Sequence, residues 1–158
     1  MAGTVDGQLA AAERACTRRG VQLTELRRQV LRLVLEAESP VGAYALLDRL
    51  KADRPGAAPP TVYRALDFLL EQGLIHKVER LNAFIGCTEA EHRHDHGTTH
   101  GHPHQFLICR ICGVTIELSD AAVTRALEAA ARRAGFVPET MTVEVEGRCA
   151  DCAVAARG

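Results

Sequence analysis

Residues 59–73 read Pro59-Pro60-Thr61-Val62-Tyr63-Arg64-Ala65-Leu66-Asp67-Phe68-Leu69-Leu70-Glu71-Gln72-Gly73. Apolar side chains recur at the three- and four-residue spacing of an amphipathic helix, at Val62, Ala65, Leu66, Leu69 and Leu70. Proline suits the first turn of a helix, where its missing N–H is not needed, and glycine suits the position after the last turn. The stretch therefore predicts a helix over residues 60–72 with one buried face.

The exposed face of this predicted helix carries side chains suited to DNA. Thr61, Tyr63 and Arg64 lie nearest its N-terminus, the end with which a recognition helix contacts bases. An arginine there can donate two hydrogen bonds to O6 and N7 of guanine, and a tyrosine can contact a thymine methyl or a phosphate. An ordinary amphipathic surface helix has the same pattern, so periodicity alone leaves both interpretations open.

The flanking segments predict a helix-turn-helix followed by a wing. Three helices are expected before residue 59, over residues 9–19, from a cap at Thr24 to the break at Ser39-Pro40, and over residues 43–53. Strand-like runs over residues 74–79 and 83–87 follow, and they predict a β-hairpin. Cys16 falls on the first helix and is expected to be a small core residue.

Residues 88–104 have no apolar period and hold six of the seven histidines, at positions 92, 94, 96, 100, 102 and 104. We interpret them as a histidine-rich linker. These histidines either recruit zinc or form a solvated loop with no further role, and composition does not separate the two readings.

The remaining chain predicts a small α/β domain. Strands are expected over residues 105–108, 114–118 and 141–145, with a helix capped by Ser119 or Asp120 and ending near residue 134. The predicted class is α+β. A winged helix-turn-helix DNA-binding domain occupies residues 1–87, the linker residues 88–104, and a dimerisation and metal-binding domain residues 105–158.

Two cysteine pairs of identical spacing, Cys109-x-x-Cys112 and Cys149-x-x-Cys152, lie in this second domain. Each pair can take two corners of one tetrahedral ion, and a closed shell of four thiolates is typical of structural rather than catalytic zinc. The alternative is a set of unpaired buried cysteines. No apolar run predicts a signal peptide or a membrane span, so we expect a cytoplasmic protein, where reduced cysteines favour metal over disulfides.

Charge is distributed unevenly along the chain, although the net charge is only −1. Residues 1–86 carry 12 Lys and Arg against 10 Asp and Glu, a net of +2, and residues 87–158 carry 7 against 10, a net of −3. The N-terminal half can therefore contact phosphates, but its charge does not demand it.

The chain resembles the ferric-uptake-regulator family, and most of all its zinc-uptake-regulator branch. The resemblance is carried by Thr61-Val62-Tyr63-Arg64, by His76-Lys77-Val78, and by both cysteine pairs in the family's order, and it spans residues 9–152. Arg27 also matches, although Glu25-Leu26 stand where members often have Pro-Gln. The resemblance implies a homodimer in which Arg27, Thr61, Tyr63 and Arg64 bind DNA.

The resemblance also implies two kinds of zinc site, with about two ions per protomer. Cys109, Cys112, Cys149 and Cys152 would hold structural zinc. His76, Cys87, His102 and Glu117 would hold regulatory zinc, with His100 or His104 as substitutes for His102. A thiolate among these ligands favours zinc over iron(II) or manganese.

The expected function is that of a zinc-responsive repressor, which binds a pseudo-palindromic double-stranded operator when zinc-loaded and represses zinc-uptake genes. No membrane partner or small-molecule substrate is expected. An iron- or peroxide-responsive repressor of the same family is the alternative, and a zinc store using the histidines is another. An enzyme is not expected, because a zinc hydrolase needs an open metal position and a deaminase needs an H-x-E sequence, which the chain lacks.

Overall fold

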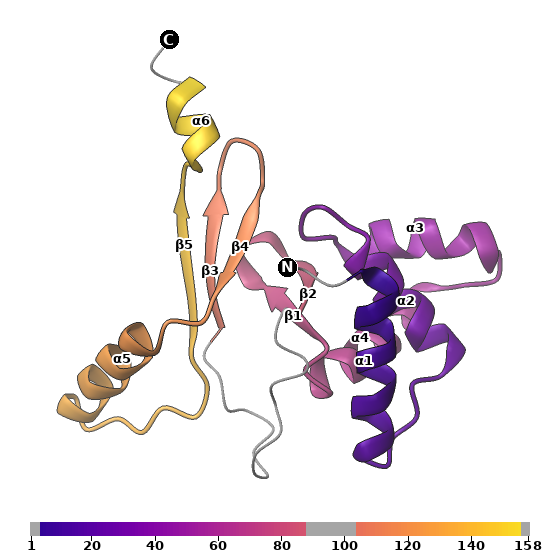
Figure 1. Ribbon diagram of the computed structural model, residues 1–158, viewed down its shortest axis with the longest axis horizontal. Helices are drawn as coiled ribbons and strands as arrows, with labels where there is room; N and C mark the ends of the chain where they lie inside the picture. The colour runs from indigo at the N-terminus through magenta and orange to yellow at the C-terminus, as the bar shows by residue number, and fades with distance from the viewer. Residues whose placement is uncertain (1–3, 88–103, 156–158) are drawn as a thin grey trace. The chain divides into compact units, whose positions relative to one another are not determined.

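The computed structural model describes residues 4–87 and 104–155. They belong to two compact units, one within residues 1–99 and the other within residues 100–158, which we call unit 1 and unit 2 and describe separately. Figure 1 shows helices and a hairpin in unit 1, and a sheet with two helices in unit 2. The predicted α+β class is confirmed. Apart from His104, the predicted linker lies outside the described residues.

Unit 1 begins with four helices, which are α1 (Val5–Arg18), α2 (Glu25–Leu35), α3 (Ala43–Asp53) and α4 (Pro59–Glu71). Helix α1 starts earlier than predicted, because Thr4 Oγ1 accepts a hydrogen bond from the Gly7 N–H at 3.2 Å and so caps it. Thr24 caps α2 in the same way, through the Arg27 N–H at 3.4 Å. That cap starts α2 at Glu25 without a proline in the first turn of the helix.

The four helices of unit 1 share one hydrophobic core. The apolar face of α4 lies in it, with Val62, Ala65, Leu66 and Leu69 each at most 2% exposed. Cys16 of α1 is 1% exposed in the same core, which confirms the prediction for this residue. Burial raises the pKa of its thiol, against the opposing charges of Arg19 and Arg27.

The predicted wing is present as β1 (Ile75–Val78) and β2 (Ala83–Gly86), an antiparallel pair joined by a short 3₁₀ turn, η1 (Glu79–Leu81). Asn82 ends that turn in the left-handed region, at φ 45°. Val41 and Phe84 exchange two backbone hydrogen bonds of 2.9 Å, which join β2 to the residue just before the Gly42 cap of α3. The wing is therefore fixed to the start of α3.

Unit 2 is a three-stranded sheet in the order β4-β3-β5, with one crossover helix. The central strand β3 (His104–Cys109) pairs antiparallel with β4 (Thr115–Leu118) and parallel with β5 (Thr142–Gly147). Parallel pairing needs a long connection, which α5 (Ala121–Arg133) supplies after a cap in which Asp120 accepts from the Ala122 N–H at 2.7 Å. A short helix that we did not predict, α6 (Ala150–Ala155), follows β5.

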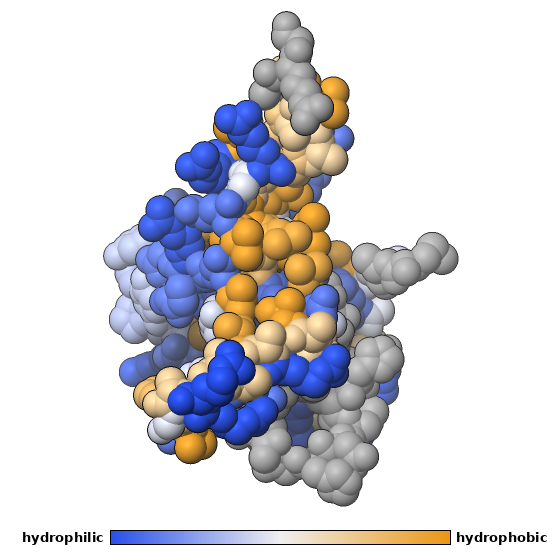
Figure 2. All heavy atoms as spheres, turned by 90° about the vertical axis from the view of Figure 1, so that its left-hand side faces the viewer, coloured by the Kyte–Doolittle hydropathy of each residue, from blue (hydrophilic) through white to orange (hydrophobic). Residues whose placement is uncertain are grey.

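An apolar stripe crosses the sheet of unit 2. Leu107 lies directly opposite Ile116 on one neighbouring strand and Val145 on the other. These side chains are 37%, 49% and 49% exposed. Figure 2 shows apolar side chains gathered over this sheet, above the mixed surface of α5. No helix within residues 4–87 or 104–155 is both long and apolar enough to cross a membrane.

Candidate metal centres and nucleic-acid interface

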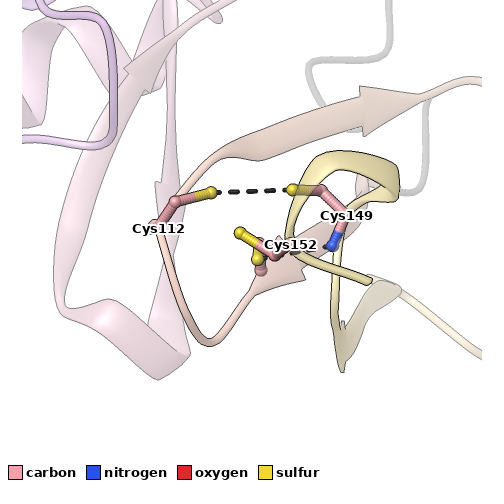
Figure 3. A group of neighbouring side chains, drawn as sticks. Cys112, Cys149 and Cys152 are labelled. Carbon is pink, nitrogen blue, oxygen red and sulfur yellow. Dashed lines mark hydrogen bonds between the residues drawn. The ribbon is translucent and has the colours of Figure 1, made fainter. Parts of the chain in front are cut away.

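The parallel strands of unit 2 bring the two cysteine pairs together. Cys109 ends β3, and its register partner is Gly147, the last residue of β5. Past that point the Arg110 N–H donates to the Gly147 carbonyl at 3.0 Å, and the Cys149 N–H donates to Cys109 Sγ at 3.3 Å. Residues 113–148 separate the pairs in sequence, and the sheet closes that gap. Figure 3 shows Cys112, Cys149 and Cys152 pointing toward one another.

The spacing of the four sulfurs fits tetrahedral zinc. All four Sγ atoms lie within 4.8 Å of one another. Cys112 Sγ and Cys149 Sγ are 3.7 Å apart. A zinc–sulfur bond of about 2.3 Å gives a tetrahedron with edges of about 3.8 Å. The cluster therefore has the ligands and the dimensions of a closed four-sulfur zinc shell.

Electrostatics favour a cation in this cluster. Backbone N–H groups of Cys112, Cys149 and Ile111 donate to Cys109 and lower the pKa of its thiol to about 6. Hydrogen bonds with the side chains of Cys149 and Cys112 raise the pKa of Cys152 to about 12, because they favour the protonated thiol. A divalent cation takes the place of the shared protons and allows all four groups to be thiolates.

The wing of unit 1 brings together two further metal-ligand types. Cys87 follows β2, and its N–H donates to the Leu74 carbonyl at 3.0 Å, so it lies opposite Leu74. His76 lies two residues along from Leu74, which puts its side chain on the same face as that of Cys87. An imidazole nitrogen and the sulfur lie within 4.8 Å of each other. His76 is 4% exposed and Cys87 7% exposed, so both are buried.

The other predicted ligands belong to the second half of the chain. Glu117 is half-buried in β4, opposite Phe106. His104 begins β3 one residue before the predicted strand, and its ring stacks on Phe106 with the centroids 6.3 Å apart. His100 and His102 lie outside the described residues.

Helix α4 presents the predicted DNA-contacting side chains near its N-terminus. Arg64 is exposed, Tyr63 is 43% exposed, and Thr61 is half-buried. We did not single out Tyr44, whose side chain is 67% exposed in the first turn of α3. Tyr44 precedes Asp48 by four residues, so both lie on the polar face of the predicted helix, and this spacing indicated that Tyr44 is exposed.

Arg27 lies within unit 1 in a contact that the sequence did not predict. Its guanidinium carbon is 3.7 Å from the centroid of the Phe68 ring on α4. Its Nη1 donates to the Gln22 carbonyl at 2.7 Å. Phe68 is an aromatic residue on the otherwise polar face of α4, four residues after Arg64, and this position was the sequence signal that its ring has a contact of its own.

The chain thus has a helical unit with a wing, followed by a mixed sheet with a four-cysteine cluster. Residues 18–146 match the family model described as "Ferric uptake regulator family". The chain belongs to the ferric uptake regulator family. This membership confirms that the chain is a transcription regulator and not an enzyme.

Within the ferric uptake regulator family, the chain is similar to zinc uptake regulators. It is 42% identical over 149 residues to the zinc uptake regulation protein of Escherichia coli (strain K12), which covers 94% of this chain and 83% of that protein. A solved zinc uptake regulator complexed with zinc and DNA matches with a TM-score of 0.88 at 39% identity, over 99% of each chain. Holo XcZur matches with a TM-score of 0.82 at 46% identity, over 94% of this chain and 99% of that one.

More distant members of the family are also similar to the chain. The peroxide-responsive repressor of Staphylococcus saprophyticus is 22% identical over 94% of each chain. The predicted likeness to the zinc branch is therefore confirmed.

Proposed function

We propose that this chain is a zinc-responsive repressor, which binds a pseudo-palindromic DNA operator when zinc-loaded and represses zinc-uptake genes. One observation carries the proposal: the wing that follows α4 holds a buried imidazole and a buried thiol side by side. A thiol and an imidazole together suit zinc better than iron(II) or manganese. The similar regulator solved with zinc and DNA supports the same function.

We assign the four cysteines of unit 2 to structural zinc. Their shell is complete without a water molecule or a further residue, so the ion would stabilise the fold rather than sense the zinc supply. For the regulatory ion we assign His76 and Cys87, completed by Glu117 and His102, with His100 or His104 as substitutes for His102. This assignment gives about two zinc ions per protomer.

The backbone joins the regulatory ligands to the recognition helix. The Cys87 N–H donates to the Leu74 carbonyl at 3.0 Å, and the Leu74 N–H donates to the Leu69 carbonyl of α4 at 2.9 Å. Zinc, when bound, supplies a centre that holds its four ligands at fixed distances. Residues 75–87 would then restrain α4 and shift the population toward the arrangement that fits DNA. Such coupling typically amounts to about 1–3 kcal/mol, or roughly 5–150-fold in affinity.

Arg64 would read a guanine in the major groove, while Thr61 and Tyr63 would contact neighbouring groups on DNA. We propose a homodimer, because a two-fold dimer reads two half-sites of a pseudo-palindrome. The stripe of Leu107, Ile116 and Val145 is the surface of unit 2 that we assign to the dimer. A repressor of this kind acts on DNA in the cytoplasm.

The experiment is a buffered zinc titration of the dimeric protein with a labelled palindromic operator, followed by fluorescence anisotropy. Zinc is expected to raise operator affinity by roughly 5–150-fold. Parallel titrations with iron(II) and manganese test the alternative, an iron- or peroxide-responsive repressor. A response to iron(II) at lower free metal than to zinc would reject zinc sensing.

Cys87→Ala tests the regulatory site in the same titration. Removing the thiolate is expected to abolish the zinc response and to leave the dimer folded, because the four-cysteine cluster of unit 2 is untouched. Cys16→Ala is the matched control, since it removes another buried thiol of unit 1. If Cys87→Ala responds to zinc as the wild type does, the assignment of Cys87 is wrong.

A further inference from the structure

Three residues on one face of α4 have different surroundings. Arg64, Phe68 and Gln72 follow one another at four-residue spacing, so they lie in a row along the helix and its C-cap. Arg64 is exposed. Phe68 and Gln72 each contact an arginine from another part of unit 1. The row therefore has one exposed end and two anchored positions.

The contact at Phe68 fixes the orientation of Arg27. The guanidinium carbon lies 3.7 Å from the ring centroid, and Nη1 is held at the same time by the Gln22 carbonyl at 2.7 Å. A planar guanidinium stacks on an aromatic face, which an ammonium group cannot do in the same way. Held by the backbone and by the ring, Arg27 joins the first turn of α2 to the middle of α4.

The contact at Gln72 holds the end of the same row. Arg19, the C-cap of α1, donates from Nη1 to the Gln72 carbonyl at 2.6 Å. The carbonyl groups at a helix C-terminus carry partial negative charge and lack partners within the helix, so a cation there is favourable. Two arginines from two elements thus fix α4 along the row that ends in Arg64.

Arg27 has an unfavourable position within its own helix. It is the third residue of α2, where the N–H groups of the first turn carry partial positive charge. The negative face of the Phe68 ring and the Gln22 carbonyl offset that repulsion. The side chain is therefore held by groups of unit 1, and its stack on α4 is part of the packing of the two helices.

We propose that Arg27 is a positioning residue, which fixes the rotation of α4 about its axis by stacking on Phe68 and so sets the direction of Arg64. The inference rests on the proposed function, and it replaces the direct DNA contact that the family resemblance implies for Arg27. A bidentate contact of Arg64 with a base requires both hydrogen bonds at once. A small rotation of α4 is enough to lose one of them.

The rival role for Arg27 is a contact with a DNA phosphate. That contact would strengthen binding to every sequence, and its loss would lower the salt dependence of binding by about 0.9 per protomer in the log–log slope. A positioning role predicts a different result. Operator affinity falls, random-sequence affinity stays nearly the same, and the salt slope is unchanged.

The experiment measures zinc-loaded dimers on the operator and on random DNA over a range of salt concentrations. The variants are Arg27→Ala, Phe68→Leu, their combination, and Phe68→Tyr, which keeps the aromatic face. Loss of the stack is expected to weaken operator binding by about 2- to 30-fold per half-site. The double variant should lose no more operator affinity than the single variant with the larger loss. Phe68→Tyr should bind the operator as the wild type does.

A readout without DNA separates this inference from the proposed function. Hydrogen–deuterium exchange at residues 68–72 should become faster in Arg27→Ala and in Phe68→Leu, and it should be unchanged in Arg64→Ala. If the wild type fails to bind the operator with zinc, the proposed function fails, and the exchange result still decides whether Arg27 holds α4.

Three results would overturn the inference. The first is an equal loss of affinity on operator and random DNA with a lower salt slope, which assigns Arg27 to a phosphate. The second is a double variant whose loss equals the product of the single losses, which makes Arg27 independent of Phe68. The third is unchanged exchange in α4.

Discussion

The DNA contact proposed for Arg64 depends on neighbours on α4 that bury their side chains. Val62, two residues before Arg64, and Ala65, one residue after it, are at most 2% exposed. The helix is therefore held by its apolar face, while Arg64 remains exposed. Periodicity in the sequence was enough to predict this division of the helix. It was not enough to predict the stack of Arg27 on Phe68, because that contact depends on how α2 crosses α4.

Arg64→Ala should weaken binding to the specific operator by about 1–3 kcal/mol per half-site, with a much smaller effect on random DNA. The reason is that only the operator offers the guanine edge that Arg64 would recognise. Anisotropy with the two DNAs measures both affinities. Glu71→Ala is a control, since it changes an exposed residue in the last turn of the same helix. Equal losses on both DNAs would show that Arg64 contacts only phosphate.

At the scale of elements, β5 decides the geometry of the four-cysteine cluster. The spacing within each cysteine pair predicted two metal ligands per pair. No spacing rule predicts that the chain between the pairs ends in a strand, β5, that runs parallel to β3. The α5 crossover does this, and the Asp120 cap and the strand before it were both visible in the sequence. Helix α6 was missed because six residues are too few to show a helical period.

Cys109→Ala should lose one zinc per chain and destabilise unit 2. Structural zinc in small domains binds with an apparent free energy of about 10–16 kcal/mol at pH 7, which is as large as the stability of a typical domain. Zinc release to a chromophoric chelator gives the stoichiometry, and circular dichroism gives the folded fraction. Cys16→Ala should keep its zinc. A Cys109→Ala protein with full zinc content would remove Cys109 from the structural site.

At the scale of the whole molecule, the two units differ in how far each buries its own apolar side chains. Unit 1 has a continuous core of buried apolar side chains from α1–α4 and the wing. Neither α5 nor α6 has a buried residue, and the sheet leaves Leu107, Ile116 and Val145 exposed. The class and order of the two units followed from the sequence. The exposed stripe did not, because alternation does not tell which face of a strand stays uncovered.

Leu107→Asp should therefore weaken the proposed dimer, because it places a charge at the centre of the apolar stripe. Sedimentation velocity over a range of protein concentrations is expected to show a monomer that keeps its structural zinc. Leu81→Asp is the control, since Leu81 is a similarly exposed leucine at the tip of the wing, 41% exposed. A Leu107→Asp protein that remains dimeric would place the interface elsewhere.

The positions of the aromatic side chains have an optical consequence. The chain has no tryptophan and only two tyrosines, and both of these, Tyr44 and Tyr63, are exposed on unit 1. All the tyrosine emission of the native protein therefore originates on α4 and in the first turn of α3. Zinc entering the four-cysteine cluster should leave that emission almost unchanged, whereas DNA docking on α4 should quench it. The unlabelled protein thus carries its own reporter for DNA binding.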